Sequence, residues 1–125
     1  ETVMIAWNSS VPAARAVRAA LPLLKSAKEV IIASFDADPS RWADGDNPGA
    51  DLAMWLSHHG CNVTVEEYVT VRKSVSQSIL ARAQEHAADL VVMGAYGRSR
   101  WNERFFGGTT ESMIKQTEMS VLLAH

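Results

Sequence analysis

The chain alternates short continuous apolar runs with longer segments in which apolar residues recur every three or four positions. Four runs predict buried strands, at residues 3–7, 30–35, 90–93 and 120–124. Residues 61–69 instead alternate apolar with polar side chains. This alternation indicates a strand with one wet face or one at the edge of a sheet.

Helical patterns separate these strands. The first helix begins near Ser10, which can cap it, and carries one apolar stripe as far as Leu24. Pro22 should kink this helix or lie near its end. Three more helices are predicted over 47–60, 74–87 and 110–116, with Trp55 turned toward the core in the first of these.

Five predicted strands alternate with four predicted helices along the chain. This order predicts an α/β fold with a parallel sheet and helices on both faces. Ligands bind such Rossmann-like sheets beyond the carboxyl ends of the strands, where the strand order reverses. The first strand ends in Asn8-Ser9-Ser10 and the fourth in Gly94-Ala95-Tyr96-Gly97. If these strands are neighbours, both sequences face one crevice and the order is 3-2-1-4-5.

A glycine-rich connection follows the fourth strand. Gly94 and Gly97 are followed, after nine residues, by Gly107-Gly108-Thr109-Thr110. Such a connection can cradle a phosphate with backbone N–H groups, or it can be a long surface loop with tight turns. Arg98 lies within it and either neutralises a phosphate or is a solvated charge. The dinucleotide pattern G-x-G-x-x-G after strand 1 and the P-loop pattern are both absent.

Composition narrows the class of protein further. At 125 residues, with 47% apolar and 21% charged residues, the chain has the size and composition of one globular domain, residues 1–125. A net charge of −2 gives no excess of positive charge that would attract nucleic acid or an anionic membrane. No apolar run is long enough to span a bilayer. The lone Cys61 favours a reducing, cytoplasmic location. Because Glu1 almost opens the first strand, we expect either a trimmed start or one half of a longer protein.

The glycine motif and the opening Ile5-Ala6-Trp7-Asn8-Ser9-Ser10 resemble those of the universal stress protein family. The resemblance extends over the whole chain to the closing Ser120-Val121-Leu122-Leu123. It is closest to the branch with a double glycine before the last helix, often found as halves of tandem proteins. The resemblance implies the strand order 3-2-1-4-5, an adenine nucleotide alpha hydrolase-like fold, and bound ATP.

Site residues also follow from the resemblance. Gly94, Gly97, Gly107 and Gly108 would surround the triphosphate, with Arg98 in the same loop. Thr109 and Thr110 would offer donors beside it. Asn8 and Ser9 would lie at the end of strand 1. The backbone of Ser34 and Phe35 would meet adenine, with the ring of Phe35 stacking on the base or filling its place.

Two positions depart from the family pattern. Asn8 stands where the family usually has an acidic residue, and Gly108 where it usually has Ser or Thr. Asn8 can hydrogen-bond a ribose hydroxyl, but it cannot help hold Mg²⁺ as a carboxylate would. Gly108 keeps its backbone N–H but has no hydroxyl.

These observations predict a cytoplasmic, stress-associated regulatory domain that binds ATP, with or without Mg²⁺, between strands 1 and 4. No nucleophile–base pair is evident, because no G-x-S-x-G elbow surrounds Ser9 and Ser10, so an enzyme is the less favoured class. The alternatives are a dimerising module that has lost ATP binding and a slow nucleotide hydrolase. The apolar edge at residues 119–124 predicts pairing with a second copy or a sister tandem domain.

Overall fold

The computed structural model describes residues 1–35, 49–69, 75–94, 108–116 and 119–124. Its strands are β1 (Thr2–Trp7), β2 (Glu29–Phe35), β3 (Val63–Tyr68), β4 (Leu90–Gly94) and β5 (Val121–Ala124). Its helices are α1 (Val11–Ser26), α2 (Ala50–His58), α3 (Val75–Glu85) and α4 (Gly108–Lys115).

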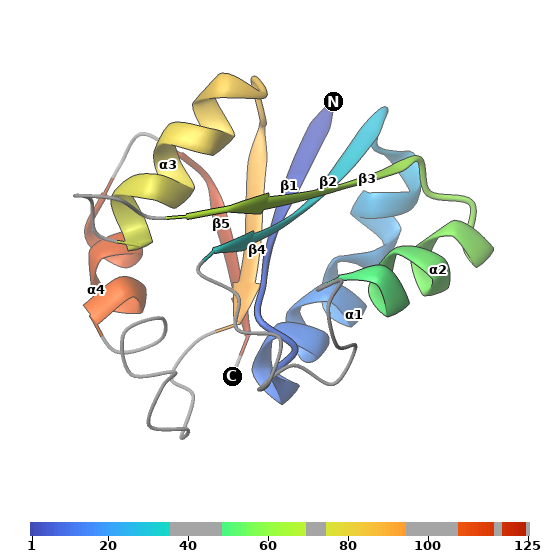
Figure 1. Cartoon of the computed structure of the whole chain (residues 1–125), viewed down its shortest axis with the longest axis horizontal. Helices are drawn as coiled ribbons and strands as arrows, with labels where there is room; N and C mark the ends of the chain where they lie inside the picture. Colours follow the sequence, from blue (N-terminus) through green and yellow to red (C-terminus); the bar gives the residue numbers. More distant parts are fainter. Residues whose placement is uncertain (36–48, 70–74, 95–107, 117–118, 125) are drawn as a thin grey trace.

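The five strands form one parallel sheet in the order β3-β2-β1-β4-β5, which confirms the predicted topology. Helices α1 and α2 cover one face, and α3 and α4 cover the other (Figure 1). Since the strands are parallel, all their carboxyl ends lie along one edge of the sheet, toward which β1, β4 and β5 point downward in Figure 1. The helices that follow β1 and β2 cover one face, and the helix that follows β4 covers the other. The switch point of the sheet therefore lies between β1 and β4.

Consecutive residues of each central strand point to opposite faces and build two cores. Met4, Ile31 and Val91 are fully buried in the core beneath α3 and α4. Ile5 and Ile32 are their counterparts beneath α1 and α2. Burial on both faces explains why these strands read as unbroken apolar runs.

Helix α1 begins as the sequence predicts. The Ser10 side chain accepts a hydrogen bond from the backbone N–H of Ala13, which satisfies one of the free donors of the first turn. The helix then runs through Pro22 to Ser26. The hydroxyl of Ser26 donates to the carbonyl of Pro22, near the end of the helix.

One expectation about the helices is wrong. Trp55 does not point into the core but is 37% exposed, because Leu52 and Leu56 alone supply the buried face of α2. Helix α4 starts at Gly108, close to the start near Thr110 that the sequence predicts. The predicted start of α2 at Asn47 and Pro48 lies outside the described residues.

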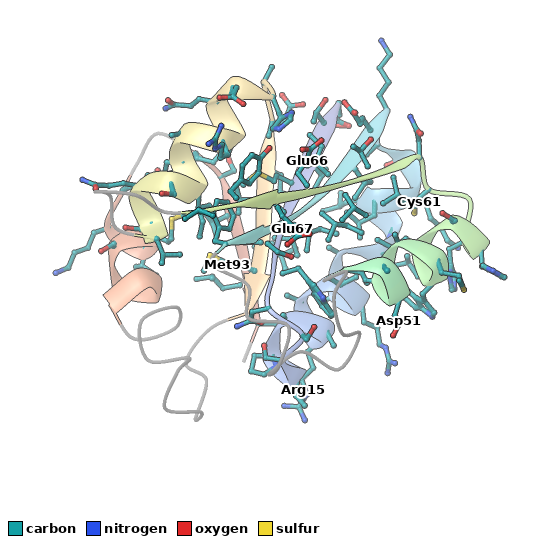
Figure 2. The ribbon with its side chains drawn as sticks, viewed as in Figure 1. Arg15, Asp51, Cys61, Glu66, Glu67 and Met93 are labelled. Atoms are coloured by element: carbon teal, nitrogen blue, oxygen red, sulfur yellow. The ribbon has the colours of Figure 1, made fainter. Side chains whose placement is uncertain are left out.

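The two outer strands differ in character. Glu66 and Glu67 project to opposite sides of β3, as Figure 2 shows, so this edge carries charge on both faces. Strand β5 carries only apolar side chains, each half-buried, and pairs with β4. The alternating strand is therefore at one edge and the apolar strand at the other, as predicted.

Candidate functional site

The candidate site lies where β1, β2 and β4 end. Trp7, the last residue of β1, is paired in register with Ser34 near the end of β2. On the other side of β1, Ala6 is in register with Met93, one residue before Gly94 at the end of β4. The ends of these three central strands are thus side by side, and the chain leaves β1 toward α1.

The turn from β1 into α1 is held by its own side chains. Asn8 is 2% exposed, and its Oδ1 accepts from the Ser10 hydroxyl at 2.6 Å and from the Ser10 backbone N–H at 3.3 Å. Ser9 between them has a φ of 59°, in the left-handed region that non-glycine residues rarely adopt. This strained residue brings Asn8 and the capping Ser10 together at the start of α1.

Buried polar atoms without a hydrogen-bond partner gather at this edge of the sheet. Within the described ranges they are Trp7 Nε1, Asn8 Nδ2 and Ser34 Oγ. All three belong to the last residues of β1 and β2 or the residue just beyond. Because buried polar groups are nearly always paired in native proteins, these unpaired atoms mark a place where water or a ligand can supply the missing hydrogen bonds. The free donor of Trp7 could not be predicted from the sequence, because it depends on which atoms surround the indole ring in the fold.

Phe35 has its ring in the core. It is 4% exposed and its ring centroid lies 5.5 Å from that of Tyr68 on β3. The Tyr68 hydroxyl is 2.8 Å from Nε2 of His86, and the Arg82 guanidinium lies 4.2 Å from the Tyr68 ring centroid. The Phe35 ring is therefore engaged within the protein, and its backbone is the part that remains at the strand end.

Gly94 has a structural reason to be glycine. A Cβ there would overlap the backbone nitrogen of Ala13 and lie 2.6 Å from the carbonyl carbon of Pro12. The end of β4 thus abuts the first turn of α1 directly. This close approach brings β4 against the helix N-terminus beside Asn8.

Of the remaining predicted site residues, only those at the start of α4 are among the described residues. Gly97, Arg98 and Gly107 are outside the described residues. Gly108, Thr109 and Thr110 form the first turn of α4, whose free backbone N–H groups can face an anion. The structure thus supplies two helix N-termini, those of α1 and α4, in the segments that follow β1 and β4.

A separate pocket of about 140 Å³ lies between α1 and α2. It is lined by Trp7, Ala14, Val17, Arg18, Leu52 and Trp55. The exposure of Trp55 is explained by this position, since its ring forms one wall instead of entering the core. The pocket borders the candidate site through Trp7.

The unpaired groups at this edge of the sheet are neutral hydrogen-bonding groups. Across those residues, no group of three or more His, Cys, Asp or Glu side chains could hold a metal ion. Burial raises the pKa of the Cys61 thiol, only partly offset by the charge of Lys25, so this cysteine is held as the unreactive thiol. Among the helices that the structure describes, none is long and apolar enough to cross a membrane.

A doubly wound parallel sheet with unpaired polar atoms at the carboxyl ends of β1 and β2 defines an α/β domain with polar groups available to a ligand. The model of the universal stress protein family matches residues 1–125. The chain belongs to that family. A search of curated protein sequences gives no match.

Solved structures share the fold. A universal stress protein from Archaeoglobus fulgidus DSM 4304 is 24% identical, with a TM-score of 0.72 over 98% of this chain. This chain covers only 43% of that protein, less than half its length. A universal stress protein in complex with cAMP is 22% identical over 100% of this chain and 97% of its own, with a TM-score of 0.65. A second structure from Archaeoglobus fulgidus, a universal stress protein in complex with dAMP, is 17% identical over 99% of this chain and 96% of its own, with a TM-score of 0.66.

Proposed function

We propose that this protein binds an adenine nucleotide, ATP, in the crevice at the carboxyl ends of β1 and β4, and that it acts as a stress-associated regulatory domain. The observation that carries this proposal is the cluster of unpaired buried atoms Trp7 Nε1, Asn8 Nδ2 and Ser34 Oγ. A nucleotide offers ring nitrogens and ribose and phosphate oxygens that can accept hydrogen bonds from such groups. The family relatives solved with cAMP and dAMP support the adenine class of ligand.

Different residues of this chain are proposed to contact different parts of the nucleotide. The backbone of Ser34 and Phe35 would lie along the base, and Asn8 and Ser9 would lie by the ribose or phosphates. The first turn of α4, with Gly108, Thr109 and Thr110, would face the phosphates through its N–H groups. Gly94 would hold β4 against α1, and Gly97, Arg98 and Gly107 would complete the phosphate contacts.

The nucleotide is proposed to act as a signal and to remain intact. The phosphates of the nucleotide would give the nucleotide-bound protein a different charge from that of the free protein. The hydroxyl of Ser10 donates its proton to Asn8 and accepts from Ala13, so it is committed to the turn and not to a base that could activate it. A slow hydrolase stays the weaker alternative.

A dimerising module without nucleotide is the second candidate. It is favoured by Asn8, which stands where the family usually has an acidic residue and whose Oδ1 is committed to Ser10. Under either candidate we propose a homodimer, or pairing with a sister tandem domain, through β5. A cytoplasmic location is proposed from the single cysteine, Cys61, which is buried.

The test is calorimetric titration of the protein with ATP and AMP, together with mass analysis of any nucleotide that copurifies. One-to-one binding of intact nucleotide supports the proposal, and Gly107→Val should abolish it while the far-UV circular dichroism stays unchanged. Absence of binding for both nucleotides favours the dimerising module. Release of phosphate with ADP or AMP would favour the hydrolase.

A further inference from the structure

The direction of the Asn8 amide is fixed by the chain itself. The backbone N–H of Ser10 can only donate, so the Asn8 atom that faces it must be the carbonyl oxygen Oδ1. The Ser10 hydroxyl accepts from Ala13 N–H at 3.2 Å, which leaves its own proton for the same Oδ1 at 2.6 Å. Both contacts identify Oδ1 as the atom that faces Ser10. The amide nitrogen Nδ2 therefore points away from the connection between β1 and α1.

This arrangement leaves Asn8 as a donor and not an acceptor. Both lone pairs of Oδ1 are directed at donors of Ser10, while Nδ2 is buried and has no acceptor among the described residues. A divalent cation such as Mg²⁺ binds oxygen ligands, and the amide N–H hydrogens repel it. Asn8 Oδ1 therefore cannot ligate a metal without giving up its hydrogen bonds from Ser10.

The other two unpaired atoms can also donate a hydrogen bond. Trp7 Nε1 is an indole nitrogen, which can only donate. Ser34 Oγ is a hydroxyl that can donate or accept, and Ser34 is fully buried. Two of the three unpaired groups at the ends of β1 and β2 thus call for an acceptor.

We propose that the end of β1 recognises an oxygen acceptor of the nucleotide through Asn8 Nδ2, and that the nucleotide binds without a divalent cation. This inference rests on the proposed nucleotide binding and adds its metal requirement. An oxygen of the ribose or of a phosphate group satisfies the buried donor directly. The site then does not require Mg²⁺, because Mg²⁺ on the nucleotide oxygens would find no ligand in Asn8.

The experiment compares dissociation constants for ATP and AMP in EDTA and in MgCl₂, by calorimetry, for the full chain and for Asn8→Asp. For the unaltered protein we expect affinity in EDTA within about twofold of that in MgCl₂, or tighter. In Asn8→Asp a carboxylate oxygen replaces the donor, so affinity in EDTA should fall about tenfold and MgCl₂ should restore it.

Each outcome has one meaning. Nucleotide that binds the unaltered protein only with MgCl₂, or an Asn8→Asp variant with unchanged metal dependence, overturns the inference while nucleotide binding stands. No binding of either nucleotide in either buffer overturns the proposed function itself, and the inference with it.

Two further variants keep the test independent of the folding of Asn8→Asp. Asn8→Ala removes the donor without adding charge, so it should weaken binding about tenfold and equally in both buffers. An unchanged affinity in Asn8→Ala overturns the role of Nδ2. Asn62→Asp is the matched control: exposed Asn62 lies just before β3, at the opposite edge of the sheet, where Nδ2 donates to the Lys28 carbonyl. It should leave both dissociation constants unchanged.

Discussion

Gly94 at the end of β4 touches Ala13 in the first turn of α1 so closely that no side chain fits between them. The contact joins the fourth strand to the first helix across the switch point of the sheet. It therefore fixes the position of the α1 N-terminus, and with it Ser10 and Asn8, relative to β4. The geometry of the candidate crevice depends on this contact.

Gly94→Ala should lower the free energy of unfolding by about 2–3 kcal/mol, because the new methyl group meets backbone atoms that cannot rotate away. Urea denaturation measures the change. Gly60→Ala is the control: Gly60 has a φ of 83° and open space around its would-be Cβ, so it should lose only about 1 kcal/mol from backbone strain. Equal losses in the two variants would contradict the proposed packing of β4 on α1.

The Tyr68 hydroxyl should make stability depend on alkaline pH. Burial raises the pKa of Tyr68, the charges of Glu66 and Glu85 raise it further, and the Arg82 charge opposes them. Because the folded pKa lies above the ordinary value of 10.0, the unfolded chain loses its proton first. The stability from the neutral phenol is present below pH 10 and is lost as the pH rises through the folded pKa.

Urea denaturation of the unaltered protein and Tyr68→Phe at pH 8 and pH 11 tests this. Tyr68→Phe should be less stable by about 1 kcal/mol at pH 8, since it loses the hydrogen bond to His86. It should also lose less stability than the unaltered protein between the two pH values. The same pH-induced loss in both proteins would exclude Tyr68 as its source.

The thiol of Cys61 should react slowly in the folded protein. Cys61 is 8% exposed and burial raises the pKa of its thiol, so both access and thiolate content are low. We expect labelling by a disulfide reagent to be at least about tenfold slower in buffer than in denaturing urea. A folded protein that labels as fast as the unfolded one would show that the start of β3 opens freely.

Leu122→Lys should convert a dimer into a monomer or cause aggregation, because β5 is an apolar strand at the edge of the sheet. Light scattering gives the mass, and circular dichroism checks the fold, since Leu122 also packs on the core beneath α1 and α2. Val69→Lys, at an exposed residue just after the opposite edge strand, is the control and should not change the mass. An unaltered chain that is monomeric at every concentration would overturn the dimer.

The site was predicted less completely than the fold. The sequence singled out Asn8, Ser34 and Gly94, and the structure brings them to one edge of the sheet, since parallel strands end together. It did not indicate that Trp7 carries an unpaired donor, nor that Gly94 is required by the backbone of α1. Both facts depend on which atoms meet across distant parts of the chain.

By itself the residue pattern determined the strands and which of them lie at an edge, because burial on two faces, one face or an edge leaves a direct imprint on it. The strand order followed from the resemblance to the universal stress protein family. The cap at Ser10 was also determined locally, because it needs only the backbone N–H of Ala13. Only the tertiary structure decided that Trp55 faces a pocket instead of the core and that Asn8 presents a donor. The physical reason is that an amide can turn either way, and the donors of Ser10 that fix its direction act only once β1 and α1 are in place.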